Sequence, residues 1–342
     1  MMKRKKTVFF LLLMIGLATA LGVAWHKLQQ FARSPLLIEQ ETIFTLPAGT
    51  GREGLEAMLK EKQVIPATVL FQWLLRAEPE LAKFKAGTYR FMPQMTVREM
   101  LALLASGKEA QFSIRFIEGS RLRDWQETLK AAPYLTHSVQ DKTPQEIAAL
   151  LDMKEAENPE GWLYPDTYLY TAGTRDSDLL LRAHHRMRNA VEEVWKNREA
   201  GLPYDSREAL LTMASIVEKE TAVKEERPQV ASVFVNRLRA GMRLQTDPTV
   251  IYGMGDDYRG VITRSALDTA TPYNTYVITG LPPTPIAMPS RASLEAAAHP
   301  AKTDYLYFVA DGKGGHRFTT NLADHNRAVR AYRSTLKDRD EQ

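Results

Sequence analysis

Two glutamates in the middle of the chain are the residues whose type and spacing first suggest catalysis. Glu218 and Glu220 end the segment 210–220, which reads LLTMASIVEKE. Its apolar residues recur with a helical period, and at about 100° per residue Glu218 falls about 80° from Leu210, on the edge of the apolar face. A carboxyl group there is partly removed from water, which favours its protonated form. Glu218 is therefore a candidate general acid, although geometry alone favours a surface salt bridge with a nearby Lys or Arg.

Glu220 falls on the other edge of the same apolar face. Two carboxylates on opposite edges of one helix cannot easily converge on one bond. Glu220 is therefore predicted to be a supporting residue, for example in an ion pair. Asp205 and Glu208 have the spacing of a capping box, which predicts where this helix begins.

Two later segments, 242–253 and 273–276, combine hydrogen-bonding side chains with aromatic rings, the mixture that sugars require. We call them the two sugar-like segments. The candidates for substrate binding in these segments are Gln245, Thr246, Asp247, Tyr252, Asn274 and Tyr276. The second segment continues into the Pro-rich stretch 280–283. Without further information, both segments are also compatible with ordinary loops.

Hydrophobic periodicity predicts the elements that position these residues. Short helices are expected within 66–77 and 143–153, longer ones over 177–196 and 228–240, and a hairpin from 305–310 and 316–319. His184 and His185 would point about 100° apart on their helix, so they are unsuited to chelating one metal. The sequence has no HExxH, GxSxG, Walker A or GxGxxG pattern. No metal and no cofactor is expected.

The composition excludes several other classes of protein. The 342 residues include no cysteine, which excludes a disulfide framework, a thiol nucleophile and a Cys-based zinc site. The formal charge is +4, but four basic residues at positions 3–6 account for all of it. The rest of the chain has as many acidic as basic residues, so a nucleic-acid-binding surface is not expected.

The N-terminal region predicts a membrane anchor. Residues 7–25 carry no charge, and 19 helical residues at about 1.5 Å each match the roughly 30 Å core of a bilayer. The basic residues before this span should stay in the cytoplasm, with the remaining chain on the other side. A signal peptide cleaved near Ala20 is the alternative. Residues 26–41 are predicted to be a connector with a break at Ser34-Pro35.

A strand-turn-helix pattern follows the connector. Residues 43–55 and 89–101 repeat it at identical spacing, and residues 114–124 form a looser third copy. The pattern is compatible with a small α+β scaffold or with a LysM-like module that binds amino-sugar polymers. Spacing alone favours the scaffold.

Several of these segments together resemble one family, the endolytic murein transglycosylases of the MltG (YceG-like) type. The matching segments are 161–168 (GWLYPDTY), 214–220 (ASIVEKE), 231–238 (ASVFVNRL), 244–252 (LQTDPTVIY), 273–276 (YNTY), 280–283 (GLPP) and 325–326 (HN). With the N-terminal anchor they cover nearly the whole chain. Thr284 and Ser290 depart from the family, which often has Gly at these positions, and the departure puts the local loop shape in doubt.

The resemblance implies an α+β protein of the cell inner membrane, with a single transmembrane helix. Residues 1–30 would be the basic tail and anchor, 31–112 a linker and LysM-like glycan-binding subdomain, and 113–342 the periplasmic catalytic domain. Glu218 matches the catalytic position, and Glu220 and Asn236 are supporting residues. The implied partners are peptidoglycan strands and the peptidoglycan synthases (penicillin-binding proteins), beside which the protein would end growing strands.

The implied reaction cleaves the bond between N-acetylmuramic acid (MurNAc) and N-acetylglucosamine (GlcNAc). Glu218 would protonate the glycosidic oxygen, and the C6 hydroxyl of MurNAc would attack to form a 1,6-anhydro end. Because the attack is intramolecular, a second catalytic carboxylate is not required. Two alternatives stay open, a muramidase that uses water and a non-catalytic, membrane-tethered glycan-binding scaffold.

Overall fold

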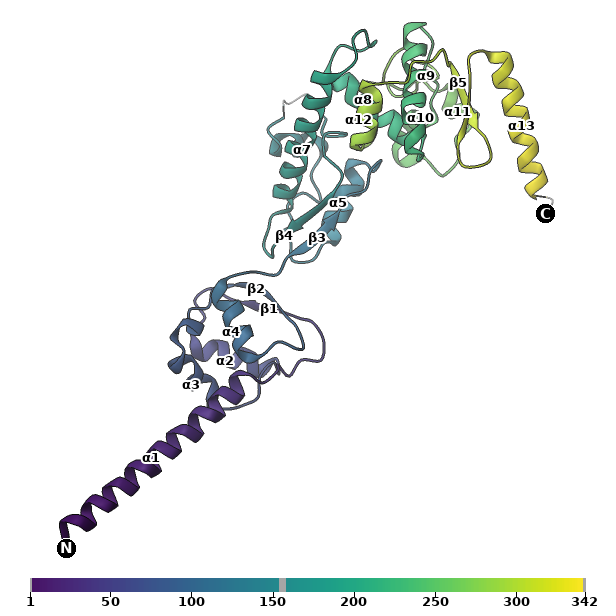
Figure 1. Cartoon of the computed structure of the whole chain (residues 1–342). Coiled ribbons are helices and arrows are strands. Elements are labelled where there is room, and N and C mark those ends of the chain that lie inside the picture. Colours follow the sequence, from purple (N-terminus) through teal and green to yellow (C-terminus); the bar gives the residue numbers. More distant parts are fainter. Residues whose placement is uncertain (1, 154–157, 341–342) are drawn as a thin grey trace. The chain divides into compact units, whose positions relative to one another are not determined.

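A computed structural model describes residues 2–153 and 158–340, and the side chains of residues 2–6 and 337–340 lie outside this description. The prediction for the basic side chains at positions 3–6 therefore falls outside the described residues. Contacts divide the chain into two compact units (Figure 1). The first extends to Phe112 and includes Tyr170–Ala172, and the second contains Ser113–Leu169 and the chain from Gly173 onward. The described residues form helices and three two-stranded sheets, which confirms the predicted mixture of helix and sheet.

The chain begins with a long helix, α1 (Met2–Ala32), whose stretch Thr7–Ala32 is long and apolar enough to cross a membrane. The predicted connector from residue 26 is wrong at its start, because the helix continues for two more turns. Leu28, Phe31 and Ala32 recur at helical spacing and are buried in the core of the first unit. The predicted break is confirmed, since the helix ends just before Ser34-Pro35.

The first unit combines one pair of strands with helices. Its elements are β1 (Thr42–Leu46), α2 (Arg52–Glu61), α3 (Leu70–Ala77), the 3₁₀ turn η1 (Pro79–Ala82), β2 (Gly87–Phe91) and α4 (Val97–Ser106). The strands are antiparallel, with Thr42 opposite Phe91 and Leu46 opposite Gly87. Phe44 and Phe91 stack with ring centres 5.2 Å apart in the core. Thr96 and Glu99 form a capping box that starts α4.

The repeated strand-turn-helix pattern is confirmed as local structure. It corresponds to β1–α2, β2–α4 and the third copy, β3 (Phe112–Arg115) with α5 (Leu122–Ala131). Only the first two strands pair with each other, because β3 instead pairs with β4 (Thr167–Tyr170). Equal sequence spacing therefore predicted the elements but not their pairing.

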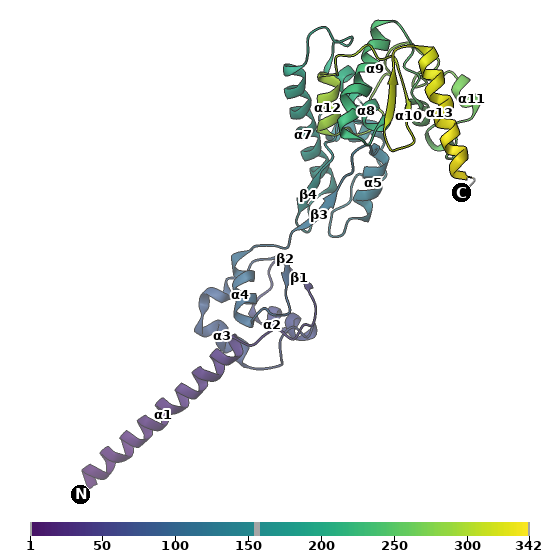
Figure 2. The same ribbon diagram turned by 45° about the vertical axis from the view of Figure 1, so that its right-hand side comes forward.

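The second unit is built around α8 (Arg207–Glu220). α7 (Asp176–Asn197), α9 (Arg227–Arg239) and α12 (Arg291–Ala298) pack against it from several sides (Figure 2). Every residue from Leu210 to Val217 is consequently buried. The single apolar stripe that periodicity predicts is thus only part of the buried surface of this helix. Ser206, and not the predicted Asp205, caps α8 by accepting a hydrogen bond from the Ala209 amide.

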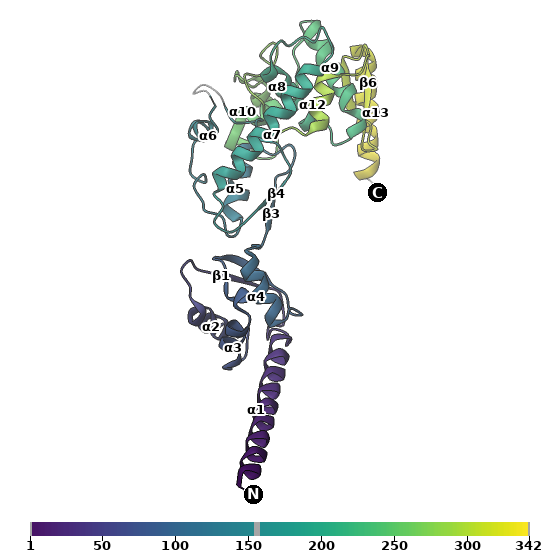
Figure 3. The same ribbon diagram turned by 60° about the vertical axis from the view of Figure 1, so that its left-hand side comes forward.

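The remaining elements of the second unit surround this bundle (Figure 3). They are α6 (Pro144–Leu150), η2 (Lys224–Glu226), α10 (Asp247–Met254), η3 (Gly255–Asp257), α11 (Arg264–Asp268), the strands β5 (Tyr307–Ala310) and β6 (His316–Thr319), and α13 (Leu322–Asp340). β5 and β6 pair as the predicted hairpin, with Tyr307 opposite Thr319. The loop interpretation of the sugar-like segments is wrong for 247–254, which is helical.

Candidate active site

Glu220 lies at the C-terminal end of α8, in the wall of a cavity of about 460 Å³. The cavity is lined from α9, β5, the start of α13 and the two sugar-like segments. Its polar lining residues are Glu220, Arg237, Gln245, Asp247, Tyr276, Tyr307, His325 and Asn326. Residues from five separate parts of the sequence therefore meet around one carboxyl group.

The surroundings of Glu220 favour its protonated form. Burial raises the pKa of Glu220 to about 7, against the lowering effect of a hydrogen bond from the Thr246 hydroxyl to Oε1. The negative charge of Asp247 raises this pKa further, whereas the positive charges of His316 and Arg237 lower it. A carboxyl group with this pKa can give up a proton and take one back near neutral pH.

Arg237 holds the first sugar-like segment in place beside Glu220. Its Nη1 donates to the backbone carbonyl of Leu244 at 2.8 Å, and its Nε donates to that of Leu306 at 2.7 Å. Gln245 then adopts a left-handed backbone conformation, with φ of 52°. This turn directs Thr246 inward, where 2% of its surface is exposed.

Direct hydrogen bonds join the two sugar-like segments. The backbone N–H of Gln245 donates to the backbone carbonyl of Thr275 at 3.1 Å, and the backbone N–H of Thr246 donates to the Thr275 hydroxyl at 3.0 Å. The Tyr276 hydroxyl donates to Asp247 Oδ1 at 2.6 Å. Four of the six predicted substrate-binding residues, namely Gln245, Thr246, Asp247 and Tyr276, therefore surround Glu220.

The other two predicted substrate-binding residues do not line this cavity. Asn274 is 1% exposed, and its Nδ2 donates to the carbonyls of Ala266, Leu267 and Thr269. Its side chain thus shapes the loop that presents Tyr276. Tyr252 points elsewhere, because its hydroxyl donates to Glu160 Oε2 at 3.3 Å.

Asn236, predicted to be a supporting residue, makes contacts of a supporting kind. Its Nδ2 donates to the carbonyls of Thr303 at 2.8 Å and Tyr305 at 3.0 Å. These two bonds tie α9 to the segment that leads into β5, a strand that contributes to the cavity wall.

Glu218 lies in a different environment from Glu220, on a separate cavity of about 690 Å³. Its side chain is 6% exposed, and Arg227 Nη2 donates to Oε1 at 3.1 Å. Oε2 accepts from the Ser290 amide at 2.9 Å, the Ser290 hydroxyl at 2.5 Å and the Ser293 hydroxyl at 2.7 Å. Four donors therefore surround the carboxylate, and its ion pair is buried instead of lying at the surface as the alternative interpretation supposed.

The two departures from the family pattern both make specific contacts. Ser290 caps α12 and contacts Glu218, so its hydroxyl is part of the Glu218 cluster. The Thr284 hydroxyl forms a 2.7 Å hydrogen bond with the Tyr273 hydroxyl. Each side chain therefore fills a role in the loop that glycine has no atoms to perform.

Glu160 is a buried acid that the sequence analysis did not select. It is 5% exposed, and its Oε1 accepts a hydrogen bond from the Leu122 amide at 3.0 Å. Burial raises the pKa of Glu160 to about 7, although this bond and the charge of Arg121 lower it. The available sequence signal was its position directly before the matching segment 161–168. Arg237, His325 and Asn326 also line the Glu220 cavity, and their only sequence signal is that they lie within matching segments.

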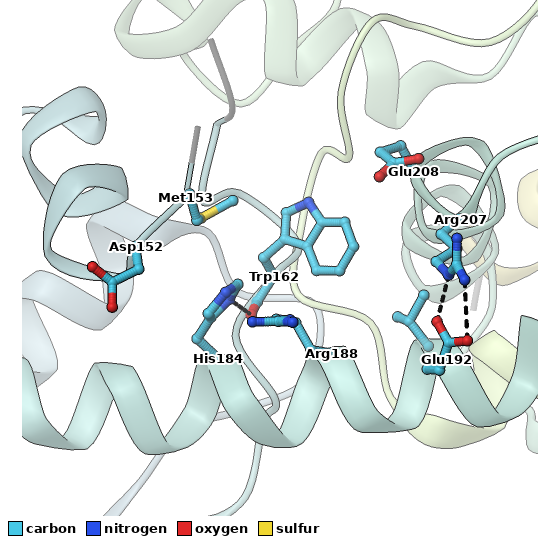
Figure 4. Close-up of a pocket in the computed structure, with 9 residues that line it drawn as sticks. Asp152, Met153, Trp162, His184, Arg188, Glu192, Arg207 and Glu208 are labelled. Carbon is cyan, nitrogen blue, oxygen red and sulfur yellow. Dashed lines mark hydrogen bonds and ion pairs between the residues drawn. The ribbon is translucent and has the colours of Figure 1, made fainter. Parts of the chain in front are cut away.

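A third cavity, of about 360 Å³, lies beside α7 and the start of α8 (Figure 4). Its His184 is buried, with Nδ1 3.1 Å from the Trp162 carbonyl, whereas His185 is exposed. Glu192 and Arg207 on its rim form an ion pair with each other. Within residues 2–153 and 158–340, no group of three or more His, Cys, Asp or Glu side chains is arranged to hold a metal.

The arrangement around Glu220 defines a class of site. A carboxyl group that exchanges its proton near neutral pH, next to hydroxyl, amide and aromatic groups, is suited to general acid catalysis on a polar substrate.

Comparison with known proteins then identifies the family. A profile of the YceG-like family matches residues 44–331. An endolytic murein transglycosylase of Bacillus subtilis (strain 168) is 34% identical over 310 residues, which cover 86% of this chain and 85% of that protein. The chain belongs to the YceG-like family, and the resemblance inferred from its motifs is confirmed.

Two further relatives agree with this assignment. An endolytic murein transglycosylase of Streptococcus pneumoniae serotype 2 (strain D39) is 28% identical over 320 residues, or 83% of this chain and 57% of that protein. The crystal structure of a YceG-like protein from Listeria monocytogenes aligns with a TM-score of 0.55 and 29% identity, over 85% of this chain and 99% of that one.

Proposed function

We propose that this chain is a lytic transglycosylase that cleaves peptidoglycan within its glycan strands. Its family membership and the two relatives named endolytic murein transglycosylase support this function. The main support for an active site at Glu220 is the cavity in which the separate motif segments meet around this residue.

Glu220, in place of Glu218, is the proposed general acid. Its protonated carboxyl group gives its proton to the oxygen between MurNAc and GlcNAc, and the bond from that oxygen to C1 of MurNAc breaks. The C6 hydroxyl oxygen of the same MurNAc bonds to C1, and the Glu220 carboxylate takes the hydroxyl proton. The products are a 1,6-anhydro end and a free GlcNAc hydroxyl, and Glu220 is protonated again.

The geometry of α8 supports Glu220 over Glu218 as the proposed acid. Glu218 and Glu220 leave α8 on different sides, and only the Glu220 side faces the cavity shared by Gln245, Asp247 and Tyr276. The only hydrogen bond to Glu220 from a described side chain comes from Thr246. Its other oxygen is thus available to a substrate, while both oxygens of Glu218 are already occupied.

Glu218 has a proposed structural role. It joins the end of α8 to Arg227 at the start of α9 and to Ser290 and Ser293 at the start of α12. These bonds hold the last turn of α8 and thereby position Glu220 two residues later. Glu218 is also the second candidate for the acid, since it lines the larger cavity of about 690 Å³.

Matched glutamine variants separate the two carboxyl groups. Glutamine keeps the shape of glutamate but cannot donate a carboxylic proton, and loss of a general acid costs roughly 10²–10⁴ in rate. Glu220→Gln should abolish measurable release of anhydro-muropeptides. Glu218→Gln, which loses only a positioning contact, should lower the rate less and leave release measurable, in protein whose fold is verified by circular dichroism. The reverse order would transfer the acid to Glu218. Reducing ends in place of anhydro ends would indicate a muramidase, and no new ends from the wild type would indicate a scaffold.

The first unit is proposed to be a LysM-like module that binds glycan. Its chain order, a strand, two helices and a second strand antiparallel to the first, supports this proposal. We further propose that α1 crosses the inner membrane, with both units on the periplasmic side next to the peptidoglycan synthases, where cleavage would end growing strands. The uncharged run 7–25 and the basic residues before it support this orientation.

A further inference from the structure

The first unit exposes an apolar surface next to the membrane-spanning helix. α1 and α3 lie against each other (Figure 3). Residues of both helices line a cavity of about 650 Å³. We define the α1–α3 face by Leu21 and Trp25 of α1 together with Val69 and Trp73 at α3. All four residues line this cavity.

The exposed residues of this face are additional to the core of the unit. α3 already buries Phe71, Leu74 and Leu75 completely against the other elements. Val69 and Trp73, four residues apart on one side of the helix, remain 72% and 57% exposed. Contiguous apolar surface of this kind marks a site of interaction with another apolar phase or partner.

The position of α1 identifies the occupant. Leu21 and Trp25 end the uncharged run that is long enough to cross a bilayer. The inference rests on the proposed membrane crossing, in which these two residues lie where the run reaches the membrane surface. Trp73 lines the same cavity as Trp25 and therefore lies at a similar level along α1. Tryptophan is the side chain most typical of the boundary between acyl chains and headgroups.

Basic residues complete this pattern. The Arg76 guanidinium lies 5.4 Å from the centre of the Trp73 ring, and Lys27 follows Trp25 on α1. Such side chains extend their charges toward lipid phosphates while their apolar stems stay at the boundary. We propose that Val69 and Trp73 insert into the membrane leaflet from which α1 emerges, so that the first unit is held at the bilayer surface by α3 as well as by α1. This proposal is independent of the catalytic function.

The absence of cysteine allows a direct test on the full chain. Val69→Cys, labelled with an environment-sensitive dye, is reconstituted in phospholipid vesicles that contain nitroxide-labelled lipids. The matched control is Lys108→Cys, an exposed position of the same unit outside the α1–α3 face. We expect the nitroxide lipids to quench the dye at position 69 and to leave the dye at position 108 bright.

A second measurement avoids the introduced label. In vesicles of brominated phospholipid, Trp73→Phe should lose part of the tryptophan fluorescence that the bromines quench in the wild type. Equal quenching at positions 69 and 108, together with an unchanged quenchable fraction in Trp73→Phe, would overturn the proposal. Shielding of position 69 from water without lipid quenching would also overturn it, in favour of a protein partner.

Discussion

Replacing Thr246 with valine tests whether protonation of Glu220 controls the reaction. Valine matches the branched shape of threonine but lacks the hydroxyl that donates to Glu220 Oε1. The backbone of Thr246 keeps its own bonds, because its amide donates to Thr275 and its carbonyl accepts from Thr249. The substitution therefore removes one contact of the carboxylate and leaves the loop anchored.

The direction of the effect follows from the charge of Glu220. Burial raises the pKa of Glu220 to about 7, and the Thr246 hydrogen bond opposes this by stabilising the ionised form. Removing that bond must raise the pKa further. A hydrogen bond to a charged group contributes roughly 1.5–3 kcal/mol. At about 1.4 kcal/mol per pKa unit, the expected increase is roughly one to two units.

The assay is the pH dependence of kcat/KM for release of anhydro-muropeptides from purified glycan strands. A general acid must be protonated in the free enzyme, so the wild-type rate should fall as the pH rises through about 7. In Thr246→Val this decline should begin roughly one to two pH units higher. The matched control is Thr212→Val, a buried position on α8 whose hydroxyl donates to the Glu208 carbonyl. If Thr246→Val is active and its kcat/KM declines over the same pH range as that of the wild type, the assignment of Glu220 is refuted.

Two other predictions concern stability and glycan binding. Burial raises the pKa of Glu160 to about 7. The folded chain therefore retains a proton that the unfolded chain releases above about pH 4.3. Stability should consequently fall as the pH rises from about 4.3 to 7. Glu160→Gln should therefore lose less stability than the wild type between pH 5 and pH 8, by up to roughly 3 kcal/mol in the free energy of unfolding. The measurement is Tm at each pH, and an equal fall of Tm with pH in both proteins would contradict the role of Glu160. Deletion of residues 42–112 should weaken binding to peptidoglycan sacculi while the second unit stays folded and slowly lytic, and equal binding would show that the first unit is a scaffold.

Local patterns in the sequence determined most of the elements. An uncharged run predicted α1, period-two alternation followed by helical spacing predicted three strand-turn-helix units, and the glycine-rich turn predicted the β5–β6 hairpin. These predictions succeeded because each depends on neighbours within about ten residues. The connector after residue 26 failed for the opposite reason, since the burial of Leu28 and Phe31 depends on the distant α3 and α4.

Only the tertiary structure decided which cavity each glutamate lines and which partners each one meets. Periodicity placed Glu218 and Glu220 correctly on two edges of one helix, but the environment of an edge depends on the elements that pack against it. Arg227 and the start of α12 surround Glu218 with donors, whereas Thr246 and Tyr276, 26 and 56 residues further along the chain, come to the side of Glu220. The sequence alone determined that a helix carries two acids at its end. Long-range packing determined that, among the described residues, Glu220 is buried with one hydrogen-bond donor, whereas Glu218 is buried with four. Burial and hydrogen bonding depend on residues that are distant in the sequence and meet only in the folded chain.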